Sequence, residues 1–269
     1  MNINSVVVRG GGDIASGTIQ KLHRSGFKVL VLEVEKPTSI RRNVAFSEAV
    51  YDGQTVVEHT KAVLVKEKNE IIKAWEDNVI PVAIDGEGEL INIIKPDVLV
   101  DAILAKKNLG TNKEMAPITI ALGPGFNAGV DVDVVIETMR GHNLGRLIFK
   151  GYALENTGTP GMIGGYSKER VIYSNCDGRI KNIKKIGEHV EVGEVVAVVG
   201  KQKIRSVIPG ILRGIIRDGS IIFNGLKIGD VDPRLTESEN FNTISDKARN
   251  IAGGVLEAIL FLANKRNNI

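Results

Sequence analysis

The stretch VVVRGGGDIASG, residues 6–17, decides the fold of the first half of the chain. It starts as an apolar run, passes through three consecutive glycines at 10–12, and then becomes polar. An uninterrupted run of β-branched residues is typical of a strand buried on both faces of a parallel sheet. The sequence therefore predicts a strand, a tight glycine turn, and a helix over residues 13–25 that stops at Gly26.

The spacing around this turn is close to that of turns that hold the phosphates of a nucleotide. Gly10 and Gly12 take the first two positions of the pattern G-x-G-x-x-G, and Ala15 takes the third as an accepted small substitute. A second predicted strand, KVLVLEV at residues 28–34, carries Glu33 where a ribose-binding acid is expected. The helix that follows the turn would aim its positive end at an anion. A purely structural turn is the alternative.

Adjacent arginines follow this predicted strand. Arg41 and Arg42 lie in the segment after it, and a guanidinium matches two oxygens of a phosphate, so the pair is expected to clamp either a second phosphate or the phosphate on a ribose. The alternative is a solvated loop in which the arginines pair with Glu33, Glu35 or Glu48.

Strand-like and helix-like segments continue to alternate along the chain. Further strands are predicted at residues 62–65, 79–85 and 98–102, with a helix at 68–78. This alternation predicts an α/β fold with a Rossmann-like N-terminal region.

A second glycine turn ends the apolar segment PITIALGPGFNAG, residues 117–129, and contains Gly123 and Gly125. Asp131 and Asp133 follow it and predict the amino end of another helix, because acids stabilise the positive end of the helix dipole.

His142 lies between glycines in the loop ETMRGHNLG, residues 137–145. An imidazole in a loop can transfer protons, so the catalytic candidates are His142, Asp131 and Asp133, with an exposed structural histidine as the alternative. The spacing of the histidines and of the single cysteine, Cys176, matches no metal-ligand motif, and no metal site is expected.

The second half contains an internal repeat. GRIKNIKKIGEHVEVGEVVAVV begins at Gly178 and GILRGIIRDGSIIFNGLKIGDV begins at Gly210, and in both a glycine recurs after nine and then six residues. Two such copies predict interlocking β halves of one small barrel, which resembles the barrel-sandwich hybrid of biotinyl and lipoyl carriers. The connection VGKQKIRS lacks the frame of a modifiable lysine, so a fold without an attached group is expected.

The chain ends in a predicted amphipathic helix. Ile251, Val255 and Ile259 fall on one face of TISDKARNIAGGVLEAILFLANKR, residues 243–266. This face either packs back on the first domain or buries itself in a symmetric homodimer, and the pattern does not choose between the two.

Composition limits the class of protein. The chain of 269 residues is 43% hydrophobic with a formal charge of +3, which is typical of a globular protein, and it has no dense basic tract for nucleic acid. No export signal and no apolar span of membrane length is visible, so we expect a cytoplasmic protein without a membrane partner.

The predicted fold class is α/β, with a Rossmann-like region followed by a small barrel-sandwich domain and a helix. The expected divisions are a nucleotide-binding region at 1–110, a second α/β region with glycine loops at 111–168, the β domain at 169–235, and the C-terminal helix at 236–269. The residues expected to bind a dinucleotide-type cofactor are Gly10, Gly11, Gly12, Asp13, Ala15, Gly17, Glu33, Arg41, Arg42, Gly123 and Gly125.

Long motifs distributed over the whole chain resemble those of one family. They are VVVRGGGDIASG, KPTSIRRNVAFSEAVYDG, LGPGFNAGVDVDVVIETMRGHNLG, NTGTPGMIGG, LKIGDVDPR and TISDKARNIAGGVLEAIL. Together they resemble the YqeB family, accessory proteins of selenium-dependent molybdenum hydroxylases, and the opening is similar to the Rossmann part of XdhC-type maturation factors. The resemblance implies a maturation factor that modifies or inserts a molybdopterin-type cofactor, with the hydroxylase as its protein partner.

Three functions remain open at this point. In the first, the glycine turn holds molybdopterin dinucleotide or NAD(P) for a maturation step. In the second, the protein is a NAD(P)-dependent or cofactor-modifying enzyme that uses His142, Asp131 or Asp133. In the third, the protein is a scaffold that docks the client, and its nucleotide fold is vestigial.

Overall fold

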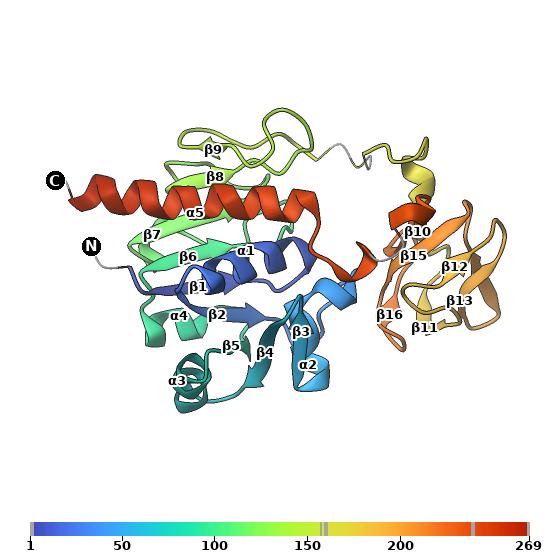
Figure 1. Cartoon of the computed structure of the whole chain (residues 1–269), viewed down its shortest axis with the longest axis horizontal. Helices are drawn as coiled ribbons and strands as arrows, with labels where there is room; N and C mark the ends of the chain where they lie inside the picture. The colour runs from blue at the N-terminus through green and yellow to red at the C-terminus, as the bar shows by residue number, and fades with distance from the viewer. Residues whose placement is uncertain (1–2, 157, 159–160, 238–239, 268–269) are drawn as a thin grey trace. The chain divides into compact units, whose positions relative to one another are not determined.

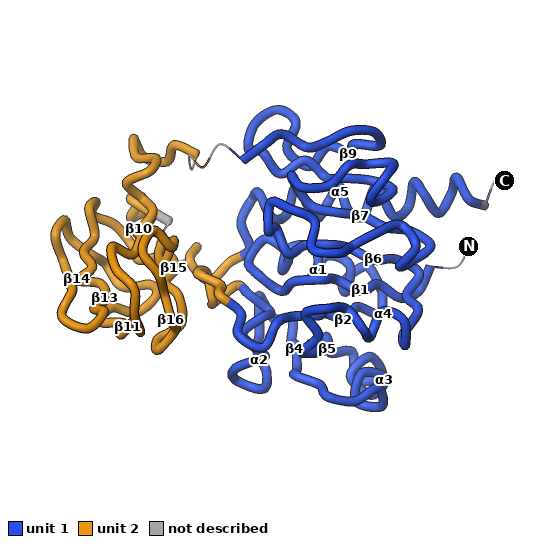
Figure 2. Tube along the Cα trace, turned by 180° about the vertical axis from the view of Figure 1, so that it is seen from behind, with its two compact units in different colours: residues 1–37, 45–156, 244–269 blue, residues 38–44, 157–243 orange. Residues whose placement is uncertain are grey.

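The computed structural model describes residues 3–156, 158, 161–237 and 240–267 (Figure 1). The chain forms two compact units, each built from separate parts of the sequence (Figure 2). Unit 1 comprises residues 1–37, 45–156 and 244–269, and unit 2 comprises 38–44 and 157–243. This division differs from the expected boundaries, because a short segment near residue 40 belongs to the second unit and the C-terminal helix to the first.

Unit 1 is built on a nine-stranded sheet in the order β3-β4-β5-β2-β1-β6-β7-β8-β9. The pairs from β4 to β8 are parallel, whereas β3 and β9 pair antiparallel at the two edges. The strands are β1 (Ser5–Arg9), β2 (Lys28–Glu33), β3 (Gln54–Val57), β4 (Thr60–Val65), β5 (Ile80–Ile84), β6 (Val98–Asp101), β7 (Ile118–Leu122), β8 (Val134–Ile136) and β9 (Leu147–Ile148). The strands predicted at 62–65, 79–85 and 98–102 are confirmed.

Helices cover both faces of this sheet. Short α2 (Ala49–Asp52) precedes β3, and α3 (Lys68–Glu76) and α4 (Glu89–Ile94) bring Ile71 and Ile91 into a core with Leu30 on β2. The helix predicted at 68–78 is therefore confirmed. On the other face α1 (Asp13–Arg24) packs along α5 (Asp246–Asn267), as Figure 1 shows in blue and red.

The contact between α1 and α5 requires a small residue. A Cβ atom at Gly17 would lie 2.7 Å from the carbonyl oxygen of Ala248 on α5. The start of α5 is also fixed to the β3–β4 hairpin, where Glu58 Oε1 accepts hydrogen bonds from Ile244 N at 2.7 Å and from Arg249. The C-terminal helix thus packs on the first unit, which is the first of the two alternatives. None of the described helices is long and apolar enough to cross a membrane.

Unit 2 consists of two four-stranded antiparallel sheets, ordered β10-β17-β15-β12 and β14-β13-β11-β16. The two copies of the repeat pair with each other. In the first copy β12 pairs with β15 of the second copy, and β11 pairs with β16 of the second copy. The strands are β10 (Val171–Tyr173), β11 (Gly178–Asn182), β12 (His189–Val190), β13 (Val195–Val199), β14 (Gln202–Arg205), β15 (Gly210–Ile215), β16 (Ile221–Ile222) and β17 (Lys227–Asp232).

The predicted fold class, a Rossmann-like region followed by a biotinyl/lipoyl-like barrel-sandwich and a C-terminal helix, is wrong. The large sheet is mixed and runs on to β9, well beyond residue 110. The described residues between β6, β7 and β8 form loops and the 3-10 helix η3 (Lys113–Met115), where a doubly wound sheet would have α-helices. The structure is instead a large mixed sheet covered by helices, together with two antiparallel sheets.

The helix predicted after Asp133 is also wrong. Val134, Val135 and Ile136 form β8 and are fully buried between β7 and β9. Three consecutive β-branched residues favour a strand, and burial on both faces outweighs the capping signal of the two aspartates.

Two adjacent glycines on α5 offer a test of this packing. A Cβ atom at Gly253 would meet only Lys21 Nζ, at 3.8 Å, whereas one at Gly254 would overlap the carbonyl oxygen of Gly145. Gly253→Ala is therefore expected to stabilise the protein by about 0.5–1 kcal/mol through helix propensity. Gly254→Ala is expected to destabilise it by about 1–3 kcal/mol, because the loop must move away. Urea unfolding measures both, and equal effects of the two substitutions would contradict this packing.

Candidate functional site

The turn between β1 and α1 is shaped by close contacts of its backbone. Gly10 has φ +90°, and a Cβ there would lie 3.0 Å from the carbonyl oxygen of Ala102. A Cβ at Gly11 would lie 2.9 Å from Ser47 N. Gly12 is the N-cap residue of α1 and has no side chain with which to cap the helix. The glycines thus bring the chain around tightly and place a residue without a side chain at the amino end of α1.

The segment at 46–48 holds the turn in this shape. Ser47 N donates to the carbonyl oxygen of Gly11 at 2.9 Å. Ser16 Oγ accepts from Phe46 N at 3.1 Å and donates to the carbonyl oxygen of Gly12 at 3.0 Å. Because Ser16 and Phe46 are fully buried, these bonds are protected from water and keep the turn rigid.

Glu33 ends β2 as predicted, but its carboxylate binds the turn itself. Oε2 accepts from Gly11 N at 2.8 Å, and Oε1 accepts from Val34 N at 2.9 Å. Burial raises the pKa of Glu33 against the opposing effect of these two donors. Glu33 therefore positions the turn, and both its oxygens already have a backbone partner.

Lys247 is a half-buried cation on the first turn of α5 that the sequence analysis missed. Burial lowers the pKa of its ammonium, and Arg140 lowers it further, whereas Asp13, Glu137 and Asp246 raise it. Asp13 is the first residue of α1, so Lys247 lies among charges gathered near the amino end of that helix. The sequence did carry one indication of Lys247: a lysine in the first turn of a helix is unfavourable, because its charge opposes the helix dipole.

A buried polar network links β1 to β6 at the carboxyl ends of these two strands. Arg9 Nη1 donates to Thr111 Oγ1 at 2.7 Å, and Thr111 Oγ1 donates to Asp101 Oδ2 at 2.6 Å. Arg9 Nη2 also donates to the carbonyl oxygen of Gly86 at 2.9 Å. Burial raises the pKa of Asp101, although Thr111, the amide of Ile103 and Arg9 oppose this. The network ties two loops to the strand that leads into the glycine turn.

The other predicted glycines serve close packing. Ala15 and Gly17 are buried in α1, and Gly17 makes the contact with α5. Gly123 has φ +76°, and a Cβ there would lie 2.5 Å from Thr138 Oγ1. Gly125 has φ +109°, and a Cβ there would lie 2.7 Å from the backbone of Lys107. The close packing around Gly123 and Gly125 therefore requires glycine at both positions, whether or not a ligand binds.

The two predicted phosphate-binding arginines belong to unit 2. Arg41 Nη2 donates to the carbonyl oxygens of Thr243 at 2.9 Å and Asn240 at 3.3 Å. Arg42 Nε donates to the carbonyl oxygen of Ile215 at 2.9 Å. Both therefore hold segment 38–44 within unit 2, and the glycine turn lies in unit 1.

The predicted catalytic aspartates take part in local structure. Asp131 Oδ2 accepts from Asn127 N at 2.8 Å and closes a turn. Asp133 Oδ2 accepts from Thr119 N at 2.9 Å and from its hydroxyl at 3.0 Å, and Asp133 Oδ1 lies 3.3 Å from Lys113 Nζ.

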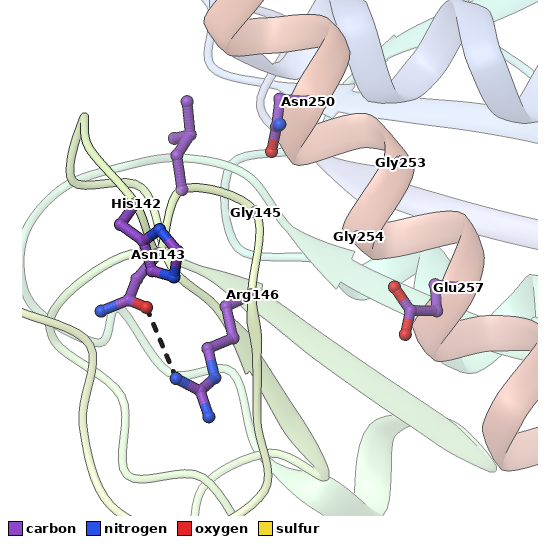
Figure 3. Close-up of a pocket in the computed structure, with 9 residues that line it drawn as sticks. His142, Asn143, Gly145, Arg146, Asn250, Gly253, Gly254 and Glu257 are labelled. Atoms are coloured by element: carbon purple, nitrogen blue, oxygen red, sulfur yellow. Dashed lines mark hydrogen bonds between the residues drawn. The ribbon is translucent and has the colours of Figure 1, made fainter.

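His142 is exposed and lines an open polar pocket of about 640 Å³ (Figure 3). Asn143 and Arg146 lie on the same loop, with Asn143 Oδ1 3.4 Å from Arg146 Nη1, and Glu257 faces the pocket from α5. Neither Asp131 nor Asp133 lines this pocket, so the structure does not bring the three catalytic candidates together there. Among the described residues there is also no group of three or more histidine, cysteine or acidic side chains that could hold a metal ion.

Thr111 offers a test of the buried network. Thr111→Val keeps the shape of the side chain but removes the hydroxyl, so Asp101 and Arg9 each lose a buried partner. The free energy of unfolding is therefore expected to fall by about 1–3 kcal/mol. Because the pKa of Asp101 is already raised, its charged form destabilises the folded state once the pH exceeds the unfolded pKa of about 3.9. Losing the hydroxyl raises the pKa of Asp101 in the folded state further. The loss of stability should therefore grow as the pH rises from acid to neutral.

Urea unfolding at several pH values measures this effect, and Thr111→Ser, which keeps the hydroxyl, is the control. A loss in Thr111→Val that is the same at every pH would show that the hydroxyl does not act on the charge of Asp101.

Comparison with known proteins gives one close relative. No family model matches the chain. A curated protein of Escherichia coli strain K12, described as the uncharacterized protein YqeB, is 50% identical over 260 residues, which is 97% of this chain and 48% of that protein. The chain thus spans about half the length of the curated relative.

Solved structures give only remote similarity. The ectoine utilization protein EutE (DoeB) from Ruegeria pomeroyi, with product bound, is 12% identical with a TM-score of 0.25 over 85% of both chains. An aspartoacylase family protein from Mesorhizobium loti is 12% identical with a TM-score of 0.26, over 86% of this chain and 85% of that one. These scores are too low to assign a fold or an activity. On the sequence match, the chain belongs to the YqeB family.

Proposed function

We propose that this protein binds the pyrophosphate of a dinucleotide-type cofactor at the β1–α1 turn and acts as a cytoplasmic maturation factor for a selenium-dependent molybdenum hydroxylase. The observation that carries the proposal is the amino end of α1, where the N-cap residue is a glycine and a partly desolvated lysine interacts with the first residue of the helix. The pathway rests on the family resemblance of the motifs, and the binding site rests on the geometry.

The amino end of α1 provides the first part of an anion site. The helix is 12 residues long, so its aligned peptide dipoles leave a partial positive charge at the end that follows Gly12. Backbone N–H groups in the first turn of a helix have no partner within the helix and point toward a ligand at its end. A pyrophosphate there would accept these hydrogen bonds without any side chain.

Lys247 provides the second part. An ammonium that burial has partly stripped of water binds an anion more strongly than an exposed one, because less hydration is lost. Asp13, Glu137 and Asp246 place negative charge near this ammonium, and Arg140 places positive charge near it. The carboxylate of Glu137 is held by backbone donors, since Oε1 accepts from Met139 N at 2.7 Å and Oε2 from Leu154 N at 2.9 Å.

The position of the turn in the sheet supports the same ligand. From β1 the chain continues to β2, which pairs with one side of β1. The other side of β1 pairs with β6. In open sheets of parallel strands, ligands bind beyond the carboxyl ends of the strands where the strand order reverses. The candidate ligands are molybdopterin dinucleotide and NAD(P), which share a pyrophosphate and a nucleoside.

In this proposal each residue has a binding or positioning role. The backbone of Gly12 and Asp13 and the ammonium of Lys247 would hold the phosphates, and Glu33 and Ser16 would keep the turn in shape. The bound cofactor would supply whatever redox or transfer chemistry the maturation step needs. The geometry favours binding over catalysis by Asp131 and Asp133, because the carboxylate of Asp131 closes a turn and that of Asp133 binds Thr119 on β7.

Two substitutions test the site directly. Gly12 has φ −66° and ψ 179°, which any residue adopts, so Gly12→Val should fold while its side chain obstructs the anion. Lys247→Gln should weaken binding of pyrophosphate, cytidine nucleotides or NAD(P) by about tenfold, which corresponds to one charge-assisted hydrogen bond. Calorimetric titration measures both variants.

The matched control is Lys21→Gln, which removes a lysine from the opposite end of α1. Unchanged affinities in Gly12→Val and Lys247→Gln, or an equal loss in the control, would remove the site assignment.

The ammonium of Lys247 also makes binding dependent on pH. Its pKa lies below that of an ordinary lysine, so its charge is lost at a lower pH than for exposed lysines. Affinity for pyrophosphate should therefore fall as the pH rises through this pKa, whereas Lys247→Arg, which stays charged, should keep its affinity. Titrations across the alkaline range test this, and identical pH profiles for both proteins would contradict the role of Lys247.

A further inference from the structure

The open pocket beside His142 has no role in the proposed function. It lies between the β8–β9 loop, residues 137–146, and α5, and its volume of about 640 Å³ is in the range of small-molecule sites (Figure 3). Its lining belongs entirely to unit 1. The charged and polar side chains that line it are those of His142, Asn143 and Arg146 on the loop and of Asn250 and Glu257 on α5.

The loop and the helix are fixed against each other, so the pocket is preformed. A Cβ atom at Gly254 would overlap the carbonyl oxygen of Gly145, and one at Gly145 would overlap Asn250 Oδ1. Gly145 N also donates to the carbonyl oxygen of Glu137 at 2.9 Å, which closes the loop. A site that already has its shape loses little free energy to ordering when it binds a ligand.

The side chains around the pocket have unused hydrogen-bonding capacity. Among the residues that the structure describes, the side chains of His142, Asn250 and Glu257 make no hydrogen bond or ion pair. Within the same described residues, the guanidinium of Arg146 binds only Asn143 Oδ1, at 3.4 Å. A ligand in the pocket would therefore find a free carboxylate on the helix and free N–H donors on the loop.

The pocket continues from the proposed anion site along α5. At about 100° per residue, Lys247, Asn250 and Glu257 fall within about 80° of one another around the helix, and so lie on one face. At 1.5 Å per residue, Lys247 and Glu257 are about 15 Å apart along the axis, and both side chains are long. A ligand whose phosphates bind at Lys247 can therefore extend along this face into the pocket.

The chemistry of the pocket fits the base of such a ligand. One carboxylate and one guanidinium line it, so it favours a group that offers both N–H donors and acceptor atoms. A carboxylate accepts from the exocyclic amino group of a base, whereas amides and guanidinium groups donate to ring nitrogens and carbonyl oxygens. The adenine of NAD(P) and the pterin of molybdopterin both carry such an amino group.

We propose that this pocket binds an amino-substituted heterocycle, which is the base end of the dinucleotide-type ligand. Glu257 accepts a hydrogen bond from the exocyclic amino group, and Asn143 and Arg146 donate to acceptor atoms of the ring. The inference rests on the proposed function, because it places the second end of the same ligand. The two ends are nevertheless tested by different residues and different probes.

The test is calorimetric titration of the full chain with two matched pairs of nucleotides, CDP against UDP and ADP against IDP. In each pair a carbonyl oxygen replaces the amino group, and the adjacent ring nitrogen changes from acceptor to donor. The amino-bearing member of at least one pair should bind the wild type about tenfold more tightly, because the carboxylate of Glu257 gains no hydrogen bond from a carbonyl oxygen. Glu257→Gln should remove this preference, since its amide can donate to that oxygen.

The matched control is Glu76→Gln, which changes an exposed glutamate of α3 on the other face of the sheet and should keep the preference. Circular dichroism checks that each variant is folded. A wild type that binds none of the four nucleotides or shows no preference in either pair would overturn the proposal. A preference that persists in Glu257→Gln, or that is lost equally in the control, would also overturn it.

Failure of the proposed function gives a different result. Inorganic pyrophosphate has no base, so its binding reports on the β1–α1 turn alone. Pyrophosphate affinity that is unchanged in Lys247→Gln, together with a base preference that requires Glu257, would contradict the anion site and support the heterocycle site. Pyrophosphate binding that requires Lys247, without any base preference, would support the anion site and contradict the heterocycle site.

Discussion

The close packing of α5 on α1 is the contact on which the proposed site depends. The contact requires Gly17, because any larger residue would collide with the backbone of Ala248. It brings a helix from the end of the chain against the first helix, so that Lys247 lies near Asp13 at the start of α1. Without it, the glycine turn would have a helix end but no half-buried cation beside it.

Buried and partly buried hydrogen bonds organise the carboxyl ends of the neighbouring strands. Glu33 binds the backbone of the turn, Ser16 joins the turn to the next segment, and Thr111 lies between Arg9 and Asp101. Exposed pairs contribute little to stability because water screens them, whereas a buried donor that loses its acceptor is costly. The shape of the turn is therefore set before any ligand arrives, which reduces the ordering needed on binding.

The elements that were predicted correctly are those with strong local signals. The segment from β1 through α1 to β2 followed from apolar runs, glycine punctuation and spacing, and α1 begins and ends within a residue of the prediction. β8 was mistaken for a helix because three strand residues carry too little periodicity to outweigh two aspartates before them. The fold class failed for a related reason, since the antiparallel edges and the missing crossover helices have no local signature.

The candidate site was predictable only in part, because its members come from distant parts of the chain. Spacing placed Gly12 and Glu33 at the turn, although the carboxylate of Glu33 binds the backbone there, and the position of Lys247 depends on helix packing that no local pattern encodes. Arg41 and Arg42 were assigned to the site because they follow β2 in sequence, and their guanidinium groups bind carbonyl oxygens of unit 2.

Native mass spectrometry of the gently purified protein tests the central claim most directly, because it asks which small molecule the folded chain retains. The account predicts a bound species whose mass contains a pyrophosphate and a nucleoside, present in the wild type and absent from Gly12→Val. A wild-type protein that carries no such species, and acquires none when cytidine or nicotinamide nucleotides are added, would contradict it.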